Sequence, residues 1–134
     1  MRKLILAVAS EPVLDDYREA LIEQLGLKLY TQIIDMNVSS IWHTKVELVA
    51  NCINMILNGQ ADFVVLASRT GNGLQVLANK NEHIRAAPIP RKEYVEEAAA
   101  LDPNMCDVDS TFNDPQAASD LVVELLNTCK SLGR

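Results

Sequence analysis

The sequence predicts an α/β fold, a three-layer αβα sandwich around a five-stranded parallel, doubly wound sheet. Short apolar runs alternate along the whole chain with segments of helical spacing. The apolar run at residues 63–67 is unbroken, which is typical of a strand buried on both faces. It leads into a loop of small residues, 68–73, and then into a short helical pattern. This order of strand, glycine loop and helix predicts an anion-binding site at the carboxyl end of the sheet.

The composition predicts one soluble domain covering residues 1–134. Apolar residues make up 49% of the chain and charged residues 22%, and no linker or repeat divides it. The formal net charge of −6 argues against a nucleic-acid partner, because nucleic acids require a basic face. Glu11 ends the first apolar run at once, and no run is long enough to span a membrane. We therefore expect neither a signal peptide nor a membrane partner.

The three cysteines, Cys52, Cys106 and Cys129, are far apart in the sequence and odd in number. This pattern favours free thiols over a disulfide framework or a zinc site. We therefore expect a cytoplasmic protein that uses no metal and no cofactor.

The first predicted strand covers residues 4–9 and is followed by a helix. Pro12 suits the first turn of that helix, where its missing N–H costs nothing, and Gly26 is expected to end it. The apolar residues at helical spacing are Leu14, Tyr17, Leu21, Ile22 and Leu25.

The second predicted strand covers residues 30–36, and Ser39 or Ser40 is expected to cap the helix after it. Residues 58–59, Asn-Gly, are expected to end this helix. Its apolar stripe consists of Trp42, Val46, Val49, Ile53 and Ile56.

Two further strands are predicted after the glycine loop, at residues 84–89 and 105–108. The helix between them carries Tyr94, Val95, Ala98 and Leu101. Asn113 or Asp114 is expected to cap the last helix, with Pro115 in its first turn. Its apolar face consists of Ala118, Leu121, Val122, Leu125, Leu126 and Cys129.

Residues in and around the glycine loop carry a resemblance to a known family. They are Gly59, Ala61, Asp62, Thr70, Gly71, Asn72, Gly73, Gln75, Val76, Ala78, Asn79, Lys80, Ile84, Arg85, Ala86 and Ala87. In these positions the chain resembles the ribose-5-phosphate isomerase B / galactose-6-phosphate isomerase family. The resemblance implies an aldose–ketose isomerase that works through an enediolate, with backbone N–H groups of the loop stabilising the oxyanion.

The chain differs from the family's pattern where protons are moved. One branch of the family uses a cysteine at the position of Ser68, and another uses a glutamate at the position of Leu74. The family's Asp-His pair aligns with Glu11 and Pro12, and its phosphate-binding arginine falls near Thr111. The resemblance therefore covers the scaffold and the anion-binding loop better than it covers the catalytic base.

We predict Ser68 and Glu11 as the catalytic residues. The predicted substrate-binding residues are Ser10, His43, Arg69, Thr70, Gly71, Asn72 and Gly73. Four of these residues have a structural alternative, and that of His43 is given below. Ser68 would instead bond its own backbone, Glu11 would stabilise a helix N-terminus, and Arg69 would face solvent.

His43, which follows the second strand, stands in for the family's missing histidines or is an exposed residue in the first turn of a helix. Asp107 and Asp109 would suggest a metal, but two carboxylates without further ligands are weak support. We interpret both as solvated residues at the end of a strand.

Two functions of different class remain. The first is an aldose–ketose isomerase of sugar phosphates or related acidic sugars. The second is a non-catalytic sugar-phosphate-binding relative, or the partner subunit of an active paralogue. In either case we expect a small anionic sugar ligand and a homodimer or dimer of dimers. The family builds each site from two chains, and the apolar stripes on the last helices need cover.

Overall fold

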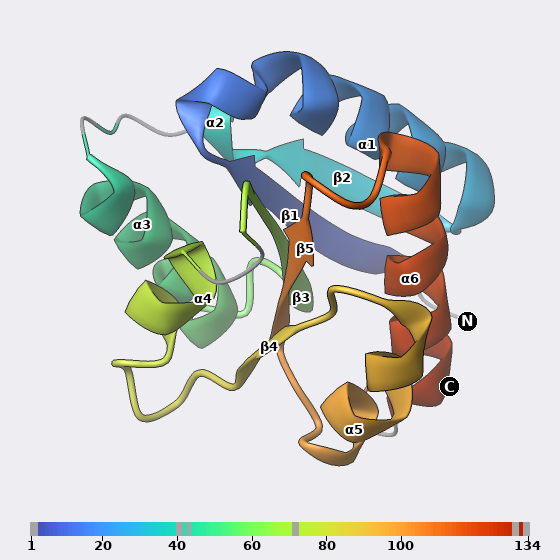
Figure 1. Cartoon of the computed structure of the whole chain (residues 1–134). Coiled ribbons are helices and arrows are strands. Elements are labelled where there is room, and N and C mark those ends of the chain that lie inside the picture. Colours follow the sequence, from blue (N-terminus) through green and yellow to red (C-terminus); the bar gives the residue numbers. More distant parts are fainter. Residues whose placement is uncertain (1–2, 40–41, 43, 71–72, 130–131, 133–134) are drawn as a thin grey trace.

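The structure is a computed structural model that describes residues 3–39, 42, 44–70, 73–129 and 132. Five parallel strands form one sheet in the order β2-β1-β3-β5-β4, with helices on both faces (Figure 1). The strands are β1 (Leu4–Ser10), β2 (Thr31–Asp35), β3 (Phe63–Ser68), β4 (Ala86–Pro88) and β5 (Met105–Asp109). This Rossmann-like αβα sandwich confirms the predicted fold class, and the strand before the glycine loop is the central one.

Helices α1, α5 and α6 cover one face of the sheet, and α3 and α4 cover the other (Figure 1). The helices are α1 (Asp15–Lys28), α2 (Met36–Ser39), α3 (Lys45–Leu57), α4 (Gly73–Ala78), α5 (Val95–Ala100) and α6 (Pro115–Thr128). Short 3-10 turns, η1 (Pro12–Leu14) and η2 (Lys92–Tyr94), precede α1 and α5. Among the described helices, none has both the length and the apolar character that crossing a membrane requires.

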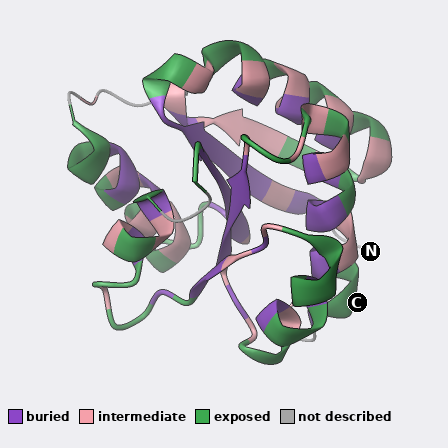
Figure 2. Cartoon of the chain, viewed as in Figure 1, coloured by how far each residue is buried: buried purple, intermediate pink, exposed green. Residues whose placement is uncertain are grey.

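The core consists of two layers because successive strand residues point to opposite faces. In β1, Leu6 and Val8 pack in the layer beneath α1 and α6, whereas Ala7 and Ala9 pack in the layer beneath α3. All of β3 is buried, as the unbroken apolar run predicts (Figure 2). The central strand therefore holds the start of the glycine loop on a rigid base.

Two predicted boundaries in the first half are wrong. Helix α1 continues past Gly26 to Lys28, so this glycine does not end it. The cap of α3 is Thr44, whose side chain accepts a hydrogen bond from the Glu47 N–H at 3.1 Å, and not Ser39 or Ser40. Ser39 is instead the last residue of α2, Trp42 precedes α3, and Ser40 lies outside the described residues.

The end of α3 and the start of α6 follow the sequence signals. Gly59, just past α3, has φ +73°, a conformation that glycine adopts without strain. The Asp114 side chain caps α6 by accepting from the Ala117 N–H at 2.8 Å. Strand β4 is shorter than predicted, and Pro88 at its end has no N–H to continue the ladder.

The apolar stripe of α6 is covered by the chain itself. Leu121, Val122 and Leu125 are buried against the core beneath α1. The expectation that this stripe needs a second subunit is therefore wrong, and any dimer must rest on another surface.

Candidate active site

Polar side chains meet at the carboxyl ends of β1, β3 and β5, which lie side by side in the sheet. Glu11 follows β1, Ser68 ends β3, and Asp107 lies in β5. All three are buried, with exposed fractions of 5% for Glu11 and 0% for Ser68 and Asp107. Buried polar groups require hydrogen-bond or ionic partners, so the partners of each side chain determine the chemistry that the site can support.

The Glu11 carboxylate holds the start of the glycine loop. Its Oε1 accepts a hydrogen bond from the Arg69 backbone N–H at 2.8 Å. Its Oε2 lies 3.1 Å from Lys45 Nζ and 3.5 Å from Arg69 Nε. Burial raises the pKa of Glu11, but the Arg69 N–H and the charges of Lys45 and Arg69 outweigh it and lower the pKa below its usual value.

The side chain of Glu11 does not cap the helix that follows it, since η1 has no side-chain cap bond. Stabilisation of the helix N-terminus by the charge of Glu11 needs no such bond, so it stays a prediction, as does the role of Glu11 as an acid or base.

Ser68 and Asp107 form a buried pair on adjacent strands. The Ser68 hydroxyl donates to Asp107 Oδ1 at 2.8 Å, and the Gln75 N–H of α4 donates to Asp107 Oδ2 at 3.0 Å. Burial raises the pKa of Asp107 to about 7 despite these hydrogen bonds, and the charge of Glu11 adds to the rise. Two interpretations are corrected here, because Ser68 does not bond its own backbone and Asp107 is not solvated.

Asp109 and Thr111 hold the loop from the β5 side. Asp109 is 5% exposed, so it is not a solvated strand end either, and its Oδ1 accepts from the Thr111 N–H at 2.8 Å. The Thr111 hydroxyl donates to the Arg69 carbonyl. Thr111, which stands near the position of the family's phosphate-binding arginine, therefore holds the loop in place.

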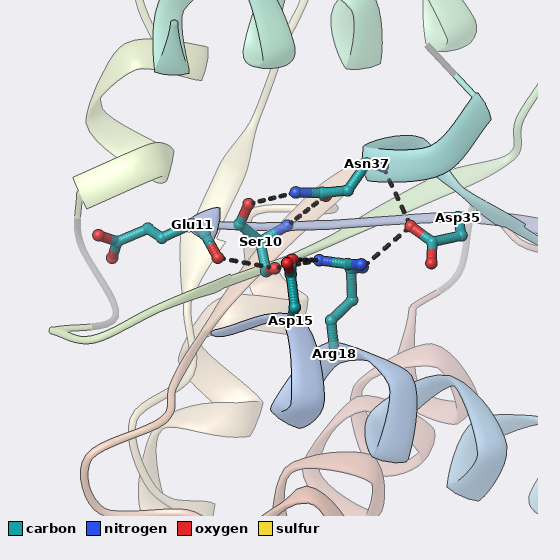
Figure 3. Close-up of polar contacts among 6 residues, drawn as sticks. All are labelled: Ser10, Glu11, Asp15, Arg18, Asp35 and Asn37. Atoms are coloured by element: carbon teal, nitrogen blue, oxygen red, sulfur yellow. Dashed lines mark hydrogen bonds and ion pairs between the residues drawn. The ribbon is translucent and has the colours of Figure 1, made fainter. Parts of the chain in front are cut away.

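Ser10 belongs to a buried network around Arg18 (Figure 3). Arg18 Nη1 donates to Ser10 Oγ at 3.0 Å and to Asp15 Oδ1 at 2.5 Å. Arg18 Nε lies 2.9 Å from Asp35 Oδ1, in an ion pair whose geometry makes no hydrogen bond. The Glu11 carboxylate points away from this cluster (Figure 3). Arg18 therefore joins α1 to the ends of β1 and β2.

Asn37 closes the same network from α2. Its Oδ1 accepts from the Ser10 N–H at 3.0 Å, and its Nδ2 donates to the Ser10 carbonyl at 2.9 Å (Figure 3). Ser10 has no exposed surface. It fixes the corner at which the chain leaves β1 for Glu11, and its role as a substrate contact stays a prediction.

The sequence matches the family described as Ribose/Galactose Isomerase over residues 6–134. The chain belongs to this family. The match covers nearly the whole domain and confirms the resemblance carried by the glycine loop and its flanks. Among curated proteins, no sequence gives a significant match.

Solved structures of this isomerase family share the fold. Ribose-5-phosphate isomerase B from Giardia lamblia aligns with a TM-score of 0.79 at 22% identity, covering 94% of this chain and 96% of that one. The ribose 5-phosphate isomerase from Thermotoga maritima aligns with a TM-score of 0.77 at 20% identity, covering 96% and 89%. The Mycoplasma genitalium enzyme, solved with bound ribulose-5-phosphate, aligns with 0.78 at 16% identity, covering 96% and 87%. At these identities the likeness shows the fold.

The remaining predicted site residues lie around the loop. The Arg69 side chain is 64% exposed, and Thr70 and Gly73 are exposed at the two ends of the loop. Gly71, Asn72 and His43, also predicted to bind substrate, lie outside the described residues. In the described part of the chain, no three His, Cys, Asp or Glu side chains are arranged to hold a metal ion.

The sequence analysis gave no site role to three charged residues that lie here: Arg18, Lys45 and Asp107. Arg18 and Lys45 lie on helices, where charged residues are usually exposed. Asp107 did leave a signal, because it interrupts the apolar pattern of a strand whose other residues are apolar up to Val108. An acidic residue inside a buried strand needs a partner, and that partner is Ser68.

Proposed function

We propose that this protein interconverts aldose and ketose sugar phosphates, or related acidic sugars, through an enediolate. The chain belongs to an isomerase family, and one observation in its structure supports the proposal most directly. Two buried carboxyl groups, Glu11 and Asp107, flank the start of the glycine loop from the strands on either side of β3. Their surroundings move their pKa values in opposite directions. Such a pair supplies one ionised group and one group that exchanges a proton near neutral pH.

The reaction needs a proton moved between adjacent carbons and an oxyanion stabilised meanwhile. In the proposed mechanism, backbone N–H groups of the loop from Thr70 to Gly73 stabilise the oxyanion. Lys45 and Arg69 supply positive charge beside the same loop and offset the charge of the sugar's acidic group. Charge-assisted contacts of this kind are the stronger hydrogen bonds available to a protein.

The direct test is to incubate the protein with ribose 5-phosphate and with galactose 6-phosphate in deuterated water and to follow the products by NMR. We expect conversion of aldose to ketose with deuterium entering at the exchanging carbon, because an enediolate exposes the carbon-bound proton to solvent. Conversion in which the carbon-bound hydrogen is wholly retained would favour a hydride shift and contradict the enediolate. A failure of any sugar phosphate to convert would contradict the isomerase itself.

A non-catalytic sugar-phosphate-binding relative, or partner subunit of an active paralogue, is the second candidate. It is favoured by Ser68 and Leu74, which stand where the two branches of the family carry their cysteine or glutamate base. A thermal-shift screen of sugar phosphates and sugar acids separates the two candidates, since a ligand of the folded state raises the melting temperature without turnover. Binding without any conversion supports this second function.

We also propose a homodimer, or a dimer of dimers. Large apolar side chains are exposed around the carboxyl end of the sheet, where the site lies: Val13, Val38, Val46 and Phe112. A second copy seated there would cover them. Light scattering that gives a monomer at micromolar concentration would contradict this arrangement. The free, buried thiols of Cys52, Cys106 and Cys129 support a reducing compartment, for which the cytoplasm is our proposal.

A further inference from the structure

The family position that holds a base is occupied in this chain by Ser68, whose hydroxyl is a weak base on its own. A serine becomes useful in proton transfer when a neighbouring group accepts its proton. Among the residues that the structure describes, the Ser68 hydroxyl donates to Asp107 Oδ1, at 2.8 Å. The proton of the hydroxyl therefore already points at a carboxyl group.

We propose that Ser68 and Asp107 together replace the missing base, with the Ser68 hydroxyl meeting the sugar and Asp107 storing the proton behind it. Asp107 acts through Ser68 and is thus a positioning residue, whereas Ser68 is the catalytic one. The inference rests on the proposed isomerase function and names the residues that move its proton.

The groups that face Asp107 suit this role. Ser68 of β3 bonds one carboxyl oxygen, and the Gln75 N–H of α4 bonds the other. The charged group that acts on Asp107 is Glu11, just after β1, which is itself paired with Lys45 and Arg69. Because burial raises the pKa of Asp107 to about 7, the carboxyl group gains and loses a proton within the range in which a general base is most effective.

Ser68 Oγ takes the proton from the sugar carbon beside the carbonyl while its own hydroxyl proton passes to Asp107 Oδ1. The electrons of the broken C–H bond form the carbon–carbon double bond, and the carbonyl π electrons move onto oxygen. Ser68 then gives a proton to the neighbouring carbon and regains one from Asp107. The proton of the second sugar oxygen passes to the first, so the ketose forms and the pair is unchanged.

The sugar must reach Ser68, which has no exposed surface in this structure. Gly73 is a close neighbour, since a Cβ atom there would stand 4.0 Å from Ser68 Cβ. The proposal therefore requires a local rearrangement that exposes the Ser68 hydroxyl when a ligand binds. The alternative role of Asp107 is purely structural, because its carboxylate also caps the start of α4.

The test of proton storage uses kcat/KM for ribose 5-phosphate from about pH 5 to about pH 9. In the parent we expect kcat/KM to rise to a plateau above about pH 7, as Asp107 ionises. We expect Asp107→Asn to lose about a hundredfold or more and to lose this rise, since general base catalysis contributes about 100- to 10,000-fold. In the Asp107→Asn background, Ser68→Cys should restore at least about tenfold, because a thiolate takes the proton without help.

A purely structural Asp107 would not give this rescue. A full rate and unchanged pH profile in Asp107→Asn overturns the inference and leaves the isomerase function standing. If Asp107→Asn does not fold, Ser68→Ala carries the same test, because the hydroxyl links the carboxyl group to the sugar. A full rate in Ser68→Ala overturns the relay. A parent that converts no sugar phosphate overturns the proposed function and this inference with it.

Access is measured without turnover by alkylating Ser68→Cys with iodoacetamide. The native cysteines Cys52, Cys106 and Cys129 have no exposed surface, so their background reaction is slow. We expect the new thiol to react at least about tenfold faster than they do and to be protected by ribose 5-phosphate. A new thiol as slow as the native ones overturns the proposal, because no sugar would then reach this position.

Discussion

The Glu11 carboxylate accepts a hydrogen bond of 2.8 Å from the backbone N–H of Arg69, and the two residues directly follow neighbouring strands. The bond joins the end of β1 to the first residue after β3. It also places a buried negative charge beneath a loop that is proposed to bind anions. The positive charges of Lys45 and Arg69 offset the negative charge of Glu11, so this charge is neutralised within the site.

Replacing Glu11 by Gln should lower the free energy of unfolding by about 1–2 kcal/mol at neutral pH. A neutral amide oxygen accepts the Arg69 N–H more weakly than a carboxylate does. Because the pKa of Glu11 is lowered in the fold, this stability is present above about pH 4.5 and is lost as the pH falls through the folded pKa. Urea unfolding at neutral and acid pH measures both effects.

The matched control for Glu11→Gln is Glu93→Gln. The Glu93 side chain is 73% exposed and lies 3.8 Å from Arg91, so its loss should cost less than about 0.5 kcal/mol. An equal loss of unfolding free energy in Glu11→Gln and Glu93→Gln would show that the hydrogen bond to Arg69 does not stabilise the fold measurably.

Replacing Arg69 or Lys45 by Ala should weaken binding of ribose 5-phosphate by roughly ten- to a hundredfold, with the fold intact. A charge-assisted hydrogen bond contributes about 1.5–3 kcal/mol, and both side chains are at least half exposed. Calorimetry measures the affinities. Lys80→Ala, an exposed change just past the far end of α4, should leave the affinity unchanged. Unchanged affinity in Arg69→Ala would show that Arg69 only faces solvent.

The individual strands and helices follow from local patterns, whereas the site depends on contacts that no local pattern contains. Unbroken apolar runs, Pro12, Asp114 and Gly59 each acted through neighbours within a few residues, so the strands and most helix ends were predictable. Gly26 misled because glycine tolerates a helix interior when the helix packs well. Tertiary packing decided that case.

The residue pairs of the site, unlike these local signals, join residues that are far apart in the sequence. Ser68 and Asp107 are 39 residues apart, and their bond exists because β3 and β5 are neighbours in the sheet. Only after the strand order is known does the acidic residue in β5 acquire a partner. The family resemblance drew attention to Ser68, but it offered no counterpart for Asp107.

Replacing Arg18 by Met should lower the free energy of unfolding by roughly 2–3 kcal/mol. Arg18 is 3% exposed and holds Ser10, Asp15 and Asp35 together, and removing one partner of a buried ionic network is costly. The expected loss of unfolding free energy is smaller than for a fully buried network because the Asp15 side chain is 60% exposed. Urea unfolding measures it, with Arg91→Met as the control.

Arg91 is a fair control because its side chain is 67% exposed and its partner, Glu93, is exposed as well. That change should cost less than about 0.5 kcal/mol. If Arg18→Met costs no more than Arg91→Met, the buried network does not stabilise the corner at Ser10.

Asp107 should make the protein less stable as the pH rises from about 4 to about 7. Its pKa is about 7 in the fold against an ordinary value of 3.8, so over this range the folded state keeps a proton that the unfolded chain has lost. Asp107 therefore lowers stability as the pH rises, whereas Glu11 raises it. A difference of this size corresponds to an effect of the order of 4 kcal/mol, complete above about pH 7.

Asp107→Asn carries no titrating group at this position, so the difference in unfolding free energy between parent and variant isolates the effect. We expect the parent to lose stability relative to the variant from about pH 4 to about pH 7, and the difference to stay level at higher pH. Urea unfolding across this range gives the difference directly, and contributions of carboxylates that do not interact with Asp107 cancel in it. A difference that does not change with pH would mean that Asp107 is ionised throughout. The carboxyl group would then be a permanent cap for α4, and it would have no proton to exchange with Ser68.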